Sequence, residues 1–132
     1  MPEIGLSVML RSPQTETVLR GLLDQFETQA HVHVNLHVLD WSVARSELNR
    51  VALYQQGLDV SEVGTTWVSD LVAMNALRPF SGSEMAHIGG REAFIPSVWE
   101  TVRLLGDERP WAIPWLAETY AIHYRKDLLK QA

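Results

Sequence analysis

Apolar and polar residues alternate along two segments in the first third of the chain, residues 4–10 and 32–38. Successive side chains of a strand point to opposite faces, so residues two apart share a face. Both segments are therefore predicted to be strands with one strongly apolar face. A third, shorter strand is predicted at 60–63.

Apolar residues recur at helical spacing between and after these strands. Ser12 and Pro13 supply a capping hydroxyl and a proline suited to a first turn, so a helix is predicted from there to about Ala30. Three further helices are predicted: one capped at Asp40 and stopped by Gly57, one over 68–75, and one over 96–105. The glycine-rich stretch 81–91 is expected to be the most flexible part.

This order of elements predicts the fold class. Strands that alternate with helices, without hairpin signals, indicate an α/β domain with a mainly parallel, doubly wound sheet and helices on both faces. The last part of the chain breaks the rhythm. Residues 111–115 and 119–124 are predicted to be two strands, separated by too few residues for a helical crossover.

Length and composition exclude several classes of function. A chain of 132 residues is expected to form one domain, and with no cysteine it has neither a disulfide framework nor a thiolate metal site. The formal charge is −5 and no cationic cluster is longer than Arg125-Lys126, so a nucleic-acid partner is not expected. No apolar run approaches the roughly twenty residues of a membrane-spanning helix.

Motifs for catalysis, metals and cofactors are also missing from the sequence. There is no nucleophile elbow, no glycine-rich phosphate loop and no His-Glu-x-x-His helix, so the chain is not expected to be an enzyme or to hold a cofactor. His31, His33 and His37 share one face of the second predicted strand. The outer two would lie about 20 Å apart, too far to share an ion, and no metal site is expected.

Candidate binding residues lie in two stretches, 57–80 and 109–129. In the first, a strand leads into Gly64, Thr65, Thr66 and Trp67, which places an indole and hydroxyl groups at a strand-to-helix junction, where open α/β sheets bind ligands. In the second, Trp115 follows a proline and Glu118 comes three residues later. A sugar ring packs its C–H face on an aromatic plane and needs hydrogen-bond partners for its hydroxyls, which such residues provide.

Other interpretations of these residues remain open. Trp67 could be a core aromatic with Thr66 as a helix cap, and Glu118 could be a surface carboxylate. Trp41 and Arg11 follow the second and first strands, so they are candidates for the same crevice, although capping or rim packing would explain them as well. Backbone N–H groups at 64–66 could hold an anion, which makes a carboxylate or oxyanion the rival ligand.

Together the two stretches, in this order and about fifty residues apart, resemble the amino-terminal lobe of extracellular solute-binding proteins of bacterial ABC importers, family 1, of the sugar-binding type with the periplasmic binding protein-like II fold. The resemblance implies that residues 1–132 are one lobe, with 119–132 beginning the crossover to a second lobe. It implies reversible binding of a mono- or oligosaccharide at Trp67, Trp115 and Glu118, with Thr65 and Thr66 as polar support, whereas Arg11 and Trp41 are candidates from their positions after strands. It also implies importer membrane subunits as partners of the full-length protein and a periplasmic or lipid-anchored extracellular location.

Three further expectations follow from the sequence. A ligand-sensing domain of a signalling or regulatory protein is the alternative function, since such proteins use the same kind of lobe, and a split-gene remnant that binds nothing alone is a third possibility. The first residues lack the basic and apolar regions of a secretory signal. Apolar residues in 119–129 would be left uncovered by a single lobe, which predicts a homodimer.

Overall fold

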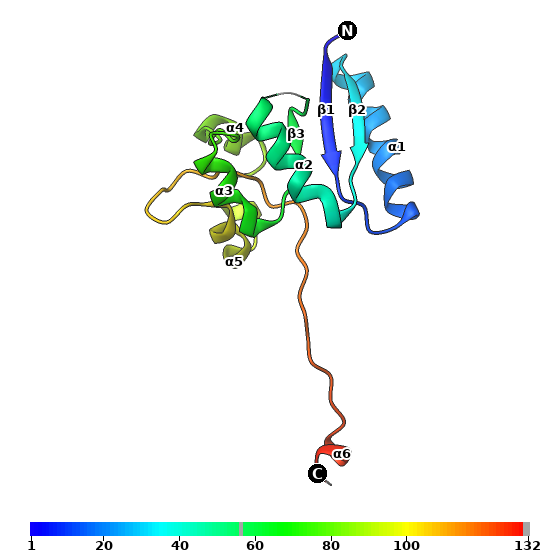
Figure 1. The fold of residues 1–132 in the computed structure, drawn as a ribbon, viewed down its shortest axis with the longest axis vertical. Coiled ribbons are helices and arrows are strands. Elements are labelled where there is room, and N and C mark those ends of the chain that lie inside the picture. Colours follow the sequence, from blue (N-terminus) through cyan, green and yellow to red (C-terminus); the bar gives the residue numbers. More distant parts are fainter. Residues whose placement is uncertain (56, 131–132) are drawn as a thin grey trace.

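A parallel three-stranded sheet forms the centre of the protein, whose computed structural model describes residues 1–55 and 57–130. The strands are β1 (Glu3–Val8), β2 (His33–Val38) and β3 (Val60–Ser61), in the order β2-β1-β3 (Figure 1). β1 is therefore the middle strand and is hydrogen-bonded on both sides. All three predicted strands are present, and their carboxyl ends lie at one edge of the sheet.

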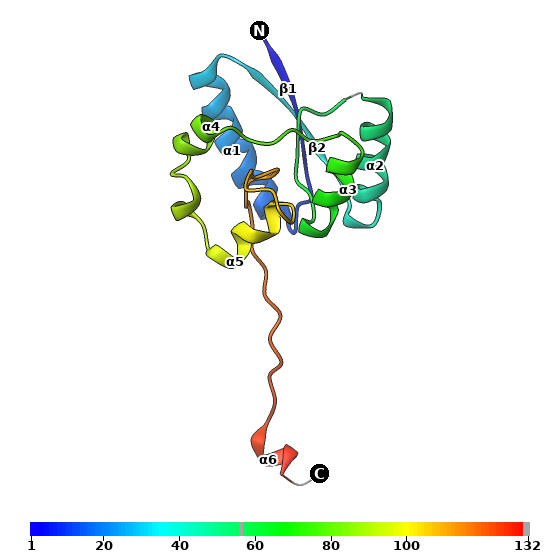
Figure 2. The same ribbon diagram turned by 90° about the vertical axis from the view of Figure 1, so that its left-hand side faces the viewer.

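Helices cover both faces of this sheet, which confirms the predicted α/β class. Figure 2 shows α1 (Pro13–Ala30) on one face and α2 (Trp41–Tyr54) on the other. A short 3-10 turn, η1 (Thr65–Trp67), follows β3 and leads into α3 (Val68–Ala73) on the same side as α2. The buried apolar side chains of the sheet and of the helices around it form the core. They are Val8, Met9, Leu19, Val34, Ala44, Leu48, Val68 and Leu71.

The helix ends follow the capping chemistry of the sequence, with one difference. Ser12 Oγ accepts a hydrogen bond from the Thr15 N–H at 3.2 Å, and Asp40 Oδ1 accepts one from the Ser42 N–H at 2.8 Å. α2 stops at Tyr54, three residues before the predicted Gly57, because Gln55 already adopts the left-handed conformation with φ 51°. Gly57 is left-handed as well, at φ 115°.

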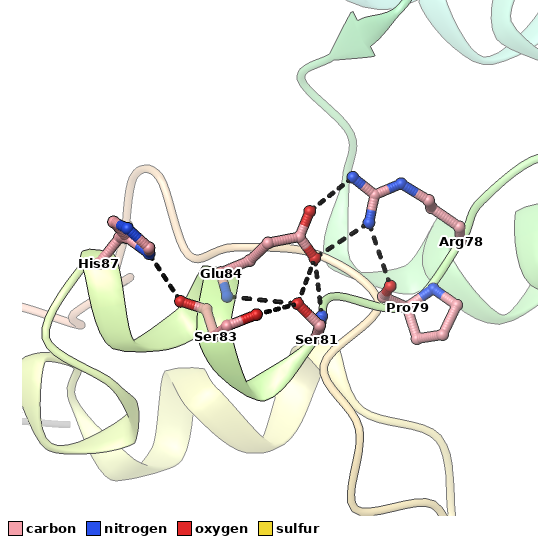
Figure 3. Close-up of polar contacts among 6 residues, drawn as sticks. All are labelled: Arg78, Pro79, Ser81, Ser83, Glu84 and His87. Carbon is pink, nitrogen blue, oxygen red and sulfur yellow. Dashed lines mark hydrogen bonds and ion pairs between the residues drawn. The ribbon is translucent and has the colours of Figure 1, made fainter.

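The expectation of a flexible stretch at 81–91 is wrong, because α4 (Gly82–His87) forms there. Its start is a capping box: Ser81 Oγ accepts from the Glu84 N–H, and the Glu84 carboxylate accepts from the Ser81 N–H at 2.8 Å (Figure 3). Arg78 Nη2 donates to the same carboxylate at 2.8 Å. These contacts hold the helix start despite the neighbouring glycines.

A second, smaller apolar cluster lies between α4 and the helices that follow it. The predicted helix 96–105 is split into α5 (Pro96–Trp99) and the 3-10 turn η3 (Glu100–Val102), and another 3-10 turn, η2 (Arg91–Ala93), precedes it. The cluster is formed by Met85, Trp99 and Val102, with Phe80, Phe94 and Ala112 against it. No helix of the described ranges is long and apolar enough to cross a membrane.

The two strands predicted at 111–115 and 119–124 do not form. An isolated antiparallel bridge joins Arg103 to Pro110, and the chain beyond Glu118 runs extended away from the body to α6 (Lys126–Leu129) (Figure 1). A β-rich composition makes a strand only where a neighbouring strand supplies hydrogen bonds, and this segment has none beside it in the described chain. Of the predicted crossover 119–132, residues 131–132 lie outside the described residues.

Candidate ligand-binding site

Side chains from three strand ends meet at the carboxyl edge of the sheet. Arg11 comes three residues after β1, Trp41 three residues after β2, and Glu62 directly after β3. The Arg11 guanidinium carbon lies 5.6 Å from the centroid of the Trp41 ring, and Arg11 Nη1 lies 3.6 Å from Glu62 Oε1. The structure thus brings Arg11 and Trp41 together where the parallel topology placed them.

Trp67 joins this group through Trp41. The two ring centroids are 5.6 Å apart with an interplanar angle of 66°, an edge-to-face arrangement that aromatic pairs favour. Trp67 is half-buried, and its indole lies against the backbone of Gly64, where an added Cβ would come within 3.1 Å of the ring. Thr65 and Thr66 are exposed, and Gly64 rather than Thr66 is the cap residue of η1.

Glu118 and Trp115 reach the same edge from the far end of the chain. Arg11 Nε donates a hydrogen bond to Glu118 Oε1. Trp115 is 59% exposed, and with Leu116 it covers a hollow of about 190 Å³. The other residues around this hollow are Val8, Met9, Leu10, Arg11, Thr15 and Glu62.

Glu62 is the residue of this edge that the sequence analysis missed. Its side chain is only 10% exposed, and Oε2 accepts a hydrogen bond from the Met9 N–H at 2.7 Å. Glu62 lay inside the third strand predicted at 60–63, whereas β3 ends at Ser61, so its place after a strand end became visible only in the structure. The pKa of Arg11 is raised, chiefly by its hydrogen bond to Glu118 and further by the charges of Glu118 and Glu62, against partial desolvation.

An apolar hollow of about 180 Å³ adjoins the first on the other side of Trp115 and Leu116. Its remaining lining is Ala93, Phe94, Ile95, Val98, Pro114 and Ala117. Complete small-molecule sites usually have volumes of roughly 300–1,000 Å³. Each hollow is smaller than this range.

The histidines of β2 are arranged differently from a metal site. His33 Nδ1 lies 3.0 Å from Glu27 Oε1 of α1, a single pairing. Within 1–55 and 57–130, no three side chains of His, Asp or Glu converge as ligands for one ion.

The fold of this chain is that of one part of a solute-binding protein, as two solved structures show. The sugar-binding protein MalE from the phytopathogen Xanthomonas citri is 22% identical and superposes with a TM-score of 0.72, over 86% of this chain and 28% of that one. A periplasmic solute binding protein from Pectobacterium atrosepticum SCRI1043 is 20% identical, with a TM-score of 0.62 over 81% and 26% of the two chains.

Curated relatives agree with this assignment of the fold. Proteins named as inferred binding proteins, from Brucella abortus (strain 2308) and Brucella suis biovar 1 (strain 1330), are each 27% identical to this chain over 98% of its length. The chain spans 31% of the length of these relatives. No family model matches it. The resemblance to a lobe of a solute-binding protein is confirmed for the fold, and these structural neighbours are binding proteins rather than enzymes.

Proposed function

We propose that this chain forms one wall of a site that reversibly binds a small solute, a mono- or oligosaccharide, without transforming it. The observation that carries the proposal is the meeting of Arg11, Trp41 and Glu62 at the carboxyl edge of a parallel sheet, with Trp67 beside Trp41. Indole faces suit the C–H face of a sugar, and carboxylate and guanidinium groups suit its hydroxyls. Thr65 and Thr66 are exposed next to Trp67 and add hydroxyl partners.

The proposal for the whole protein rests on its structural neighbours. Residues 1–132 would be one lobe, and a second lobe would close over the solute by a hinge, since a ligand that touches both lobes stabilises the closed form. In this role the protein would lie in the periplasm and would deliver its bound solute to the membrane subunits of an ABC importer. The similarity to a sugar-binding protein and to a periplasmic solute binding protein supports that role.

Tryptophan fluorescence, titrated with a panel of mono- and oligosaccharides, tests the proposal on this chain. We expect saturable changes with a dissociation constant of roughly millimolar or weaker, about −4 kcal/mol, because one wall supplies only part of the contacts. Trp67→Ala should abolish the change for every sugar that binds. Trp111→Phe serves as the control, because Trp111 lines neither hollow and its indole N–H is bonded to Asp107.

Two results would contradict the proposal. Micromolar binding that survives Trp67→Ala would remove this indole from the site and refute the argument from a single wall. An absence of any saturable response into the tens of millimolar, for the whole panel, would refute sugar binding by this edge.

A further inference from the structure

We propose that this site selects uncharged solutes and rejects anionic ones, because Arg11, the cation that lines its hollow among the described residues, is already neutralised by two carboxylates of the same chain. This inference rests on the proposed function, and it narrows the class of solute. It also makes a carboxylate or oxyanion, the rival ligand, an unfavourable occupant beside Arg11. The residues that determine it are Arg11, Glu62 and Glu118.

The balance of charge around the hollow is negative. Among the described residues that line it, Arg11 is the cation and Glu62 is an anion, and Glu118 joins Arg11 from outside. Glu16, in the first turn of α1, is paired with Arg20 at 2.7 Å and adds no net charge to this balance. Two carboxylates thus contact one guanidinium, and an incoming anion meets net repulsion where a lone arginine would attract it.

The contact of Arg11 with Glu62 is fixed by the fold. Glu62 is mostly buried and is held in place by the Met9 N–H at 2.7 Å, so it cannot swing away from Arg11 without breaking that bond. Arg11 Nε is occupied by Glu118, and the ring of Trp41 lies 5.6 Å from the guanidinium carbon. An anion would have to displace Glu118 and would still face Glu62.

The N-terminus of α1 could also attract an anion near Arg11, but one of its free N–H groups is already bonded to a side chain. Ser12 Oγ accepts the Thr15 N–H at 3.2 Å and also lies 3.0 Å from Thr15 Oγ1. This cap reduces what the helix end offers to an anion.

Sodium sulfate, compared with sodium chloride at equal ionic strength, is the probe that separates the charges from sugar binding. Glu62→Gln keeps a carbonyl for the Met9 N–H, and Glu118→Gln keeps the shape of the side chain, so the double variant releases Arg11 with little change in packing. We expect the double variant to bind sulfate at least about tenfold more tightly than the wild-type chain, a difference of about 1.4 kcal/mol. Trp41, next to Arg11, reports binding by fluorescence.

Two further variants assign the effect to Arg11. Glu47→Gln releases Arg50 on the exposed surface of α2 with a single charge change, and it should leave sulfate affinity unchanged. Arg11→Gln in the double-variant background should remove the gained affinity. Circular dichroism of each variant verifies that it is folded.

Equal sulfate affinities for the wild-type chain and the double variant, whether measurable or absent, would overturn the inference. A comparison of glucose with glucuronate, wherever sugars bind, provides the second arm, and preference for glucuronate would overturn it as well. If the sulfate contrast appears while no sugar binds, the proposed function fails and the charge selection stands.

Discussion

Ser7, the last residue but one of β1, is fully buried, and its hydroxyl has no hydrogen-bond partner among the described residues. A buried polar group left unpaired costs about 1–3 kcal/mol. Ser7→Ala removes the hydroxyl without adding volume, so we expect the free energy of unfolding to rise by about 1 kcal/mol. Urea unfolding of the variant and the wild-type chain measures this free-energy difference.

Ser69→Ala is the matched control for this prediction, because Ser69 is exposed on α3. Its effect should stay within about 0.5 kcal/mol. If Ser7→Ala instead lowers the free energy of unfolding by about 1 kcal/mol or more, the hydroxyl makes a bond that the described residues do not show.

Gly64 sets the position of the Trp67 indole. An added Cβ would lie 3.1–3.3 Å from three atoms of the ring, so the indole has to shift by a few tenths of an ångström. The backbone itself tolerates alanine, since φ is −67°. We therefore expect Gly64→Ala to weaken sugar binding several-fold with little effect on stability, as measured by fluorescence titration and urea unfolding.

Gly82→Ala is the control for the change at Gly64, because an added Cβ there meets nothing within 4 Å. It should leave sugar binding unaltered. An unchanged sugar affinity in Gly64→Ala would show that the exact placement of Trp67 does not matter, and would weaken its assignment to the site.

At the scale of elements, the start of α4 predicts a dependence of stability on pH. Hydrogen bonds from Arg78 and then from Ser81 lower the pKa of Glu84 from 4.5 to about 2 (Figure 3). The folded state therefore binds this proton less readily than the unfolded state. Its stabilisation is fully present above about pH 4.5 and is lost as the pH falls towards 2.

Glu84→Gln should lower the melting temperature at neutral pH, and the difference from the wild-type chain should close as the pH falls from about 4.5 to 2. Thermal unfolding followed by circular dichroism at a series of pH values measures the difference. Glu92→Gln, an exposed change on the neighbouring η2, should show no such convergence. A gap that stays constant across this range would contradict the role of the carboxylate.

Elements defined by their own residues were predicted well from the sequence. The period of β1 and the caps Ser12 and Asp40 act over a few positions and gave the correct start of α1 and α2. α4 was missed because three glycines outweighed the Ser81-x-x-Glu84 capping box. The strand predicted at 119–124 was wrong because a strand also depends on a neighbour, which the composition of the segment does not report.

In the candidate site, too, the residues with a local sequence signal were predicted and the contacts between distant residues were not. Arg11, Trp41 and Trp67 were predicted as candidates because each stands at the end of a strand or the start of a helix. The bond from the Met9 N–H to Glu62 joins residues 53 positions apart, so it exists only once β3 lies beside β1. The pairing of Arg11 with Glu118 spans 107 positions and was equally invisible in a local pattern.

At the scale of the whole molecule, segment 119–129 leaves apolar side chains in solvent. Tyr120 is 96% exposed and Ile122 is 94% exposed, and the backbone around them is extended without a strand partner in the described chain. Such segments pair readily with other chains. We therefore predict that the chain forms homodimers through this segment.

Light scattering on the purified chain measures the association, and the variant Tyr120→Ser/Ile122→Ser should shift it towards monomer. Thr17→Ser, an exposed change on α1, controls for the handling of the protein. A wild-type monomer at all accessible concentrations refutes the prediction. A dimer that persists in the double variant places the contact elsewhere, for example on the exposed face of α1 at Val18, Leu22 and Phe26.

The central position of β1 also determines how the two sides of the site come apart. Arg11 continues from the strand that is paired on both edges, and such strands open only when the whole domain unfolds, whereas exposed segments such as 115–118 open locally at small free-energy cost. Amide hydrogens of Leu6 and Val8 should thus exchange with solvent orders of magnitude more slowly than those of Trp115 and Glu118. At this edge a solute would therefore contact a rigid part, Arg11 after β1, and a part that opens and closes locally, residues 115–118. The second part would open many times for each unfolding of the whole domain.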